Sequence, residues 1–153
     1  MSDAARALGA LRRLAPAVYA VAALLIVVPL VDFVTSSYPF IVGDPRWRFA
    51  TVGLFAGFLM TPLLGVVLAM LTAATLQQPG VLRAFSWACL LAALVLVALR
   101  GSLVLDVLQV RAGAPADAAQ AVLLSGSRGV VNHLPAAVAF VMLYLGGRQA
   151  AEA

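Results

Sequence analysis

Four apolar blocks dominate the sequence, and each approaches or exceeds the about 20 residues that a helix needs to cross the hydrocarbon core of a bilayer. They cover approximately residues 16–36, 49–76, 84–110 and 118–145. The chain is 64% hydrophobic and 10% charged, whereas charged residues make up about 25% of an average soluble domain. Because so few charges cannot coat a soluble core, the sequence predicts an all-α polytopic membrane protein. We expect a single membrane domain over residues 1–153, built as an antiparallel bundle of four transmembrane helices.

The segments outside the blocks are short. Residues 1–15 carry leucines with arginines between them and predict an amphipathic lead at the cytoplasmic membrane surface, and residues 146–153 form a short C-terminal tail. No small-residue cleavage site closes the block 16–36, so we expect a retained signal-anchor. The Pro-Gly turn at 77–80 predicts that the second and third helices are antiparallel neighbours.

Arginines outside the blocks indicate the orientation. Five lie on the side of the termini and three on the other side: Arg6, Arg12, Arg13, Arg83 and Arg148 against Arg46, Arg48 and Arg111. This excess favours both termini in the cytoplasm. All ten basic residues are arginine and alanine is abundant, as in GC-rich genomes, and we expect a bacterial inner membrane protein. The positive charge lies mostly at helix ends, where it orients the helices, so we expect no nucleic-acid partner.

Four charged side chains lie inside the apolar blocks: Asp32, Arg100, Asp106 and Arg128. A charge near the bilayer centre costs about 2.5–3.5 kcal/mol or more, so such residues usually face a bundle interior and pair with one another. From a rise of about 1.5 Å per residue, Asp32, Arg100 and Arg128 share one level in the outer half of the bilayer, and Asp106 lies about 9 Å further out. The sequence predicts two ion pairs, Asp32 with Arg100 and Asp106 with Arg128.

Other polar residues accompany these charges at helical spacing. Ser102, Asp106 and Gln109 fall on one stripe of the third helix, and Ser125, Arg128 and Asn132 fall on one stripe of the fourth. The sequence thus predicts an intramembrane polar seam formed by Asp32, Arg100, Ser102, Asp106, Gln109, Ser125, Arg128, Asn132 and His133. Such a seam either fastens helices together or binds an ion, a proton or a polar head group. Both interpretations stay open, and helix fastening is the favoured one.

Small residues recur every four positions in the second block. Gly53, Gly57, Thr61 and Gly65 form a predicted helix-packing ridge, which permits close approach of another helix of the same chain. Pro62 within this ridge predicts a kink. The polar first half of the block 118–145 suggests a broken or partly interfacial helix.

The sequence carries few residue patterns that are typical of an enzyme. His133 is the only histidine, and no cysteine or carboxylate accompanies it at metal-ligand spacing, so we expect no metal site. A lone histidine could ligate a haem or chlorin, which makes His133 a weak cofactor candidate, yet a polar residue in a helix seam is the commoner case. No nucleophile triad, phosphate loop or dinucleotide fingerprint occurs. We expect no enzyme, no catalytic residue and no cofactor.

Residues 30–68 carry an ordered set of short elements: Leu30-Val31-Asp32, Pro39, Pro45, Trp47, Phe49, Gly53 and Pro62-Leu63-Leu64-Gly65. With this set the segment, about a quarter of the chain, resembles the HpsJ-like membrane proteins found mainly in cyanobacteria. The resemblance implies a small multi-span protein associated with exopolysaccharide secretion, without assigned catalytic residues. It also implies that Asp32, Trp47 and the segment 62–65 belong to a shared structural core.

The favoured functional hypothesis is a non-enzymatic accessory or scaffold subunit of a larger cell-envelope or energy-transducing membrane complex. Short loops leave little outside the membrane, so we expect contacts through the helices with lipids and with other membrane subunits or a second copy. One alternative is a small oligomeric transporter or channel that uses the polar seam. A second alternative is a lipid- or pigment-binding protein with His133 or Arg128 at its site.

Overall fold

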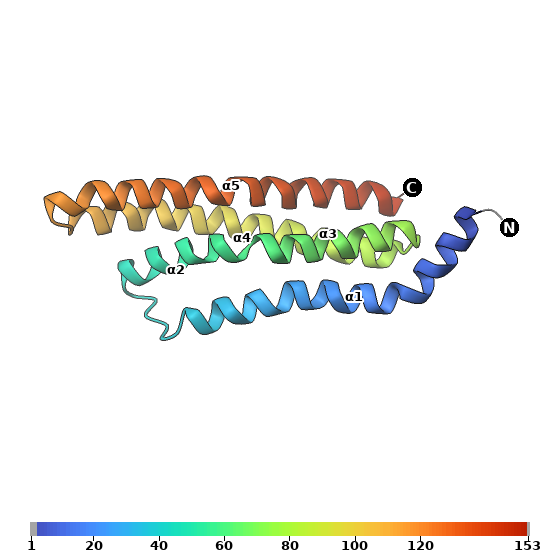
Figure 1. Cartoon of the computed structure of the whole chain (residues 1–153). Coiled ribbons are helices and arrows are strands. Elements are labelled where there is room, and N and C mark those ends of the chain that lie inside the picture. Colours follow the sequence, from blue (N-terminus) through green and yellow to red (C-terminus); the bar gives the residue numbers. More distant parts are fainter. Residues whose placement is uncertain (1–2, 153) are drawn as a thin grey trace.

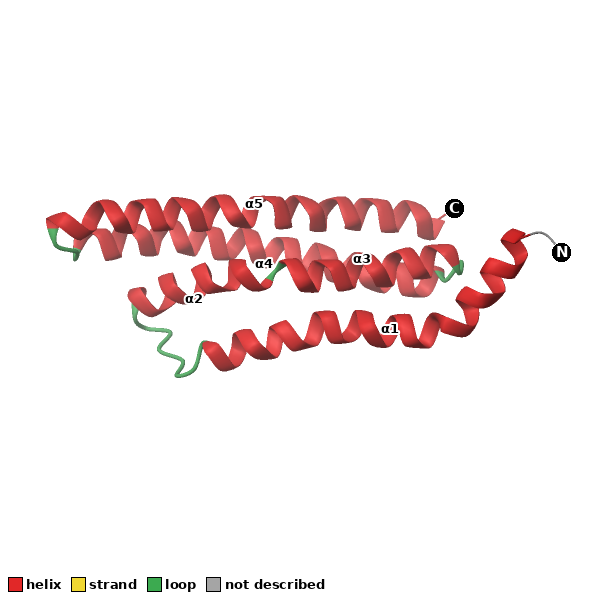
Figure 2. Ribbon diagram, in the orientation of Figure 1, coloured by secondary structure: helices red, strands yellow, loops and turns green. Residues whose placement is uncertain are grey.

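The protein is an array of long helices joined by short connections (Figure 1, Figure 2). The computed structural model describes residues 3–152, apart from the side chains of residues 3–5, 7, 56, 116, 117 and 132. The helices are α1 (Asp3–Ser36), α2 (Pro45–Phe58), α3 (Met60–Thr75), α4 (Pro79–Ala112) and α5 (Ala116–Glu152), and the described range contains no strand. Figure 1 shows α1, the consecutive α2 and α3, α4 and α5 lying lengthwise beside one another.

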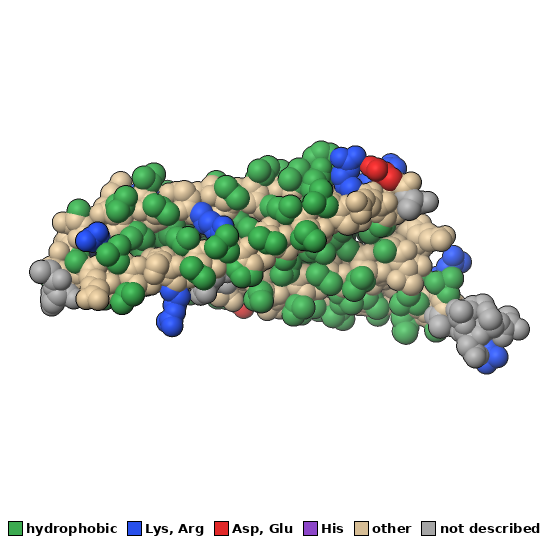
Figure 3. All heavy atoms as spheres, turned by 90° about the horizontal axis from the view of Figure 1, so that it is seen from above, with side chains coloured by type: hydrophobic (Ala, Val, Ile, Leu, Met, Phe, Trp, Pro, Cys, Tyr) green, Lys and Arg blue, Asp and Glu red, His purple; other side chains and the backbone are tan. Residues whose placement is uncertain are grey.

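Several of these helices are long and apolar enough to cross a membrane. Three single stretches qualify by length and composition, Leu8–Ser36, Pro79–Ala112 and Ala118–Glu152, and a fourth qualifies if α2 and α3 are taken as one bent span. Figure 3 shows hydrophobic side chains along the length of one face, with few charged groups among them. The all-helical fold class is therefore confirmed, and the long apolar helices are compatible with a membrane protein.

The first helix differs from the predicted division into a surface lead and a separate span. α1 runs without interruption from Asp3 to Ser36, and its first turns lie at an angle to the rest of the helix and extend past the ends of the other helices (Figure 1). Pro16 lies inside this helix, where its ring removes the hydrogen bond to the Arg12 carbonyl and favours a bend. The lead is thus a continuation of the helix at an angle.

The predicted kink in the second block is present as a break between two helices. α2 and α3 meet at Leu59 and differ in direction by 44°. Pro62 follows three residues later and has no N–H to donate to the carbonyl of Phe58, so the α-helical ladder is interrupted at this point. Regular bonding resumes at once, because Leu63 N–H donates to the Leu59 carbonyl at 3.1 Å.

The break suggested by the polar first half of the block 118–145 is absent, since α5 is one helix from Ala116 to Glu152 with Pro135 inside it. The physical reason is its partner: α5 packs along α4 over most of the length of both helices, and tertiary packing of this kind outweighs weak local propensity. The polar residues of α5 therefore remain helical.

The α4–α5 interface is a regular apolar seam. Most buried residues of α4 recur at spacings of three and four, with one step of seven between Leu96 and Leu103, which is the pattern of two helices packing at a shallow angle. They are Leu82, Ser86, Cys89, Ala93, Leu96, Leu103 and Val107, and Asp106 is buried beside them. A Cβ atom added to Gly126 would collide with Val107, and one added to Gly147 would collide with Ser86 and Met70. Ser86 and Val107 are 21 residues apart, as are Gly126 and Gly147, so these contacts fix one antiparallel register along the interface.

The contact between α1 and α3 depends on one glycine of the predicted ridge. A Cβ on Gly65 would lie 2.7 Å from the Ala22 carbonyl oxygen and 2.8 Å from Cγ1 of Ile26. At Gly53 and Gly57 a Cβ would meet nothing within 4 Å, and Thr61 is exposed. The close approach therefore begins at Gly65 and continues along α3, while the other three ridge positions face outward.

We expect Gly65→Ala to lower the free energy of unfolding by about 1–3 kcal/mol, because a backbone oxygen cannot move aside for the new methyl group. Gly57→Ala is the matched control, with open space around it, and we expect it to be neutral or slightly stabilising. Thermal unfolding of both variants in mild detergent measures the difference. Equal midpoints for the two variants would contradict the assigned α1–α3 contact.

Candidate functional site

The residues of the predicted polar seam occupy three separate environments. Asp32, Gln109, Ser125 and Arg128 are exposed on the outer surfaces of their helices. Ser102 is half-buried and donates to the Leu99 carbonyl of its own helix at 2.8 Å. Asp106 and His133 are buried and Arg100 is half-buried; Asp106 is ion-paired, and the other two have buried atoms without a partner among the described residues. The side chain of Asn132 lies outside the described residues.

Asp106 on α4 is buried, with 2% of its surface exposed, and its partner is Arg48 in the first turns of α2. Arg48 Nη2 lies 2.6 Å from Asp106 Oδ1, and Arg48 Nε donates to both carboxylate oxygens at 3.1 and 3.2 Å. The remaining Nη1 donates to the Val42 carbonyl at 2.8 Å. The guanidinium group therefore joins α4, α2 and the α1–α2 connection at one point, with the geometry of a strong charge-assisted contact.

Local contacts at the start of α2 hold Arg48 in this position. Asp44 caps the helix, since its carboxylate accepts from the Arg46 N–H at 2.8 Å. Trp47 Nε1 donates to the Ser37 carbonyl at 3.2 Å and its ring packs edge-on against Phe40. The connection between α1 and α2 is thus fixed at both ends, which keeps the arginine directed at α4.

The predicted partners of the intramembrane charges are wrong. Asp106 pairs with Arg48 and not with Arg128, which faces outward on α5. Among the described residues Asp32 and Arg100 form no ion pair, because α1 packs on α2 and α3 while Arg100 lies on α4. The sequence contained a signal for the true pair: the estimated depth of Asp106, near the outer interface, matches that of Arg48 at the outer end of the second block.

Arg100 and His133 are the least satisfied polar residues in the described part of the chain. His133 is 0% exposed, and its Nδ1 lies 2.7 Å from the Gly129 carbonyl oxygen. Because that oxygen can only accept, Nδ1 carries the hydrogen and Nε2 faces elsewhere. His133 Nε2 and the Nε and Nη2 atoms of Arg100 are buried without a hydrogen-bond partner among the described residues, an arrangement that is costly and uncommon in proteins.

An apolar cavity of about 300 Å³ lies between α1, the bent α2–α3 pair, α4 and α5. It is lined by Ile26 and Leu30 of α1, Phe55, Phe58, Leu59, Pro62 and Val66 of the bent pair, Ala88, Cys89, Ala92, Val95 and Leu96 of α4, and Phe140 of α5. The ring of Phe55 also stacks on His133, with centroids 6.4 Å apart. The cavity wall is therefore in direct contact with the histidine.

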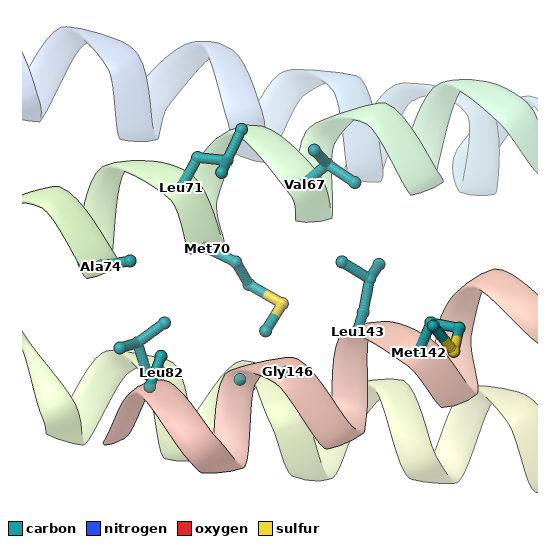
Figure 4. A pocket seen from close by; sticks show the side chains of 10 residues that line it. Val67, Met70, Leu71, Ala74, Leu82, Met142, Leu143 and Gly146 are labelled. Carbon is teal, nitrogen blue, oxygen red and sulfur yellow. The ribbon is translucent and has the colours of Figure 1, made fainter. Parts of the chain in front are cut away.

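A second apolar hollow, of about 250 Å³, lies between α3, the start of α4 and the last turns of α5. In Figure 4 Met70 extends from α3 toward α5 beside Gly146, with Leu143 and Leu82 around it. Its lining contains no titratable side chain, so we assign it no chemistry.

Within residues 3–152, apart from the undescribed side chains, no three His, Cys, Asp or Glu side chains gather in a way that could hold a metal ion. Comparison with protein-family models, curated proteins and solved structures finds no match to this chain. Three features of the described residues remain as candidates for a function: the outward charges Asp32 and Arg128, the Arg48–Asp106 pair, and the Arg100–His133 region.

We expect Asp106→Leu to lower the unfolding midpoint by several degrees, because it leaves the Arg48 charge beside a buried surface without its partner. Adding Arg48→Leu should restore part of the loss, since removing both charges costs less than removing one. Thermal unfolding of the single and double variants measures this coupling, with Arg46→Leu as the exposed control. A double variant as unstable as the sum of its two single variants would contradict the pairing.

Proposed function

We propose that the chain is a non-enzymatic accessory or scaffold subunit of a larger complex in the bacterial inner membrane. In this proposal α1, the bent α2–α3 pair, α4 and α5 form an antiparallel bundle of four transmembrane segments, with both termini in the cytoplasm. The subunit joins its complex through the outward surfaces of its helices. The observation that carries the proposal is the outward position of Arg128 in an apolar surface of α5.

Arg128 lies 12 residues inside α5, which is about 18 Å along the helix axis. Its neighbours on the outward surface are apolar, with Leu124 63% exposed and Val131 59% exposed. A charge in such a surface is costly in lipid, and a carboxylate or carbonyl group of a neighbouring subunit would remove that cost. Ser125 and Ser127 beside it are also exposed and supply further polar contacts for a partner helix.

Asp32 places a negative charge on the outward surface of α1, whereas Arg128 places a positive charge on that of α5. It is exposed on α1 between the outward-facing Val31 and Val34, which are 53% and 51% exposed. No ion pair of Asp32 or of Arg128 is found among the described residues. Two opposite charges on two outer surfaces favour a subunit with neighbours on two sides.

The transporter alternative needs a continuous polar route through the bundle. The described polar side chains are instead divided among outward surfaces, one closed ion pair and one buried pair. We therefore favour the accessory role. The resemblance of residues 30–68 to HpsJ-like proteins favours a cell-envelope complex as its setting.

We expect the tagged chain to leave the membrane in mild detergent as part of a complex heavier than its own 15.8 kDa. Arg128→Gln and Asp32→Asn should each release it from that complex without lowering its unfolding midpoint, because both side chains face outward. Size-exclusion chromatography with mass measurement checks this, with the exposed Arg111→Gln as control. A free homo-oligomer whose stability depends on a transported ion would overturn the proposal in favour of transport.

The proposed topology has its own test. Cys89 is buried and is the only cysteine, so introduced thiols can be read against a low background. We expect Gly43→Cys to react with an impermeant maleimide in intact spheroplasts, and Gln149→Cys to react only after the membrane is opened. The reverse labelling pattern would place the termini outside.

A further inference from the structure

Arg100 and His133 interrupt the two apolar stripes that form the α4–α5 seam. On α4 the buried series passes from Leu96 to Leu103, and Arg100 lies between them at the spacing of a core residue, four after the first and three before the second. On α5 the buried series passes from Gly126 through His133 to Ala137. Two polar residues therefore occupy positions where the repeat requires apolar ones.

The register of the seam places these two residues beside each other. Leu103 faces Gly129, since a Cβ on Gly129 would lie 3.3 Å from the Leu103 side chain. Arg100 lies one turn before Leu103 on α4, and His133 lies one turn after Gly129 on α5. Because the two helices are antiparallel, both steps lead toward the same end of the interface. The three unpartnered atoms, Nε and Nη2 of Arg100 and Nε2 of His133, therefore lie at one level of the bundle.

Their chemistry defines a complementary ligand. The two arginine nitrogens donate, and His133 Nε2 accepts when the ring is neutral, because Nδ1 already carries the hydrogen toward Gly129. The carboxylates nearest in depth are unsuitable, since Asp106 is engaged by Arg48 and Asp32 faces outward on α1. An acidic group with two acceptor oxygens and one retained hydrogen would satisfy all three atoms.

The cavity next to this pair is shaped for hydrocarbon. Leu96, one turn from Arg100, and Phe55, stacked on His133, both line it, and every side chain around it is apolar. Leu30 of α1 and Val95 of α4 belong to the lining and are exposed, while α1 packs on α2 and α3 and not on α4. The cavity is therefore accessible from the surrounding lipid between α1 and α4.

We propose that Arg100 and His133 bind the acidic head of a single-chain amphiphile, a carboxyl group or a phosphate monoester that keeps one hydrogen, and that its hydrocarbon tail occupies the cavity between α1 and α4. The volume of about 300 Å³ is at the lower end of small-molecule sites, which suits one chain and excludes a two-chain lipid. The ligand would enter sideways from the bilayer. This site is separate from the outward charges that carry the accessory role.

Three probes of equal chain length test the proposal on the full-length protein in mild detergent. Palmitic acid carries a carboxyl group, palmitoyl lysophosphatidate carries a phosphate monoester, and hexadecanol carries neither. We expect one or both acids to remain bound at one molecule per chain in native mass spectrometry and to raise the unfolding midpoint, while hexadecanol does neither. The acid that binds identifies the head group, and binding of neither acid overturns the proposal.

Variants separate this site from general charge attraction. Arg100→Leu completes the apolar stripe of α4, so we expect it to stay folded and to weaken binding of the acid by about tenfold or more. Ala92→Phe fills part of the cavity and should also weaken binding. Arg111→Leu, an exposed arginine of the same helix, should leave binding unchanged. Unaltered binding in a folded Arg100→Leu variant, or equal losses in Arg100→Leu and Arg111→Leu, would overturn the proposal.

Discussion

The close packing of α4 against α5 is the constraint on which the rest of the molecule depends. Gly126 and Gly147 permit the two backbones to approach, and the side chains of Val107 and Ser86 occupy the space that a methyl group would need. Because these contacts lie near opposite ends of the interface, they fix both the register and the distance of the hairpin. α2 and α3 then pack on this hairpin, and α1 packs on α2 and α3.

The register in turn decides which polar groups can meet. It directs Asp106 into the interior at the level where α2 begins, so Arg48 becomes its partner. It also brings Arg100 and His133 together in the seam, where the described residues offer no acceptor or donor for their free atoms. Two nearby levels of α4 therefore differ chemically: at one, Asp106 is closed in an ion pair with Arg48, and at the other, nitrogen atoms of Arg100 and of the facing His133 have no partner among the described residues.

The sequence predicted the apolar blocks and their connections because these follow from length and composition, which need no tertiary information. The kink near Pro62 was also predictable, because a missing N–H acts locally. The pairing of charges was not predictable, because a depth estimated from the rise per residue does not say which way a side chain points or which helices are neighbours. Asp32 has the estimated depth of Arg100, but it lies on α1, which packs on α2 and α3 and not on α4. The predicted helix-packing ridge was wrong at Gly53 and Gly57 for the same reason. Both residues have the expected four-residue spacing, but a Cβ atom at either position would have no neighbour within 4 Å. The position of Arg100, four residues after Leu96 and three before Leu103, was visible in the sequence. This spacing predicts its place in the α4–α5 interface better than its charge does.

The restriction of α1 to contacts with α2 and α3 has a consequence for assembly of the chain. Among the described residues, α1 contacts only the next two helices in the sequence, α2 and α3, and the most extensive interface, between α4 and α5, joins two consecutive helices. These two contact surfaces are therefore complete soon after the last helix of each has been synthesised, whereas α2 and α3 also contact the later helices α4 and α5. The protein can form as two successive hairpins, and the first of them needs no residue beyond Thr75 to bury the Gly65 contact.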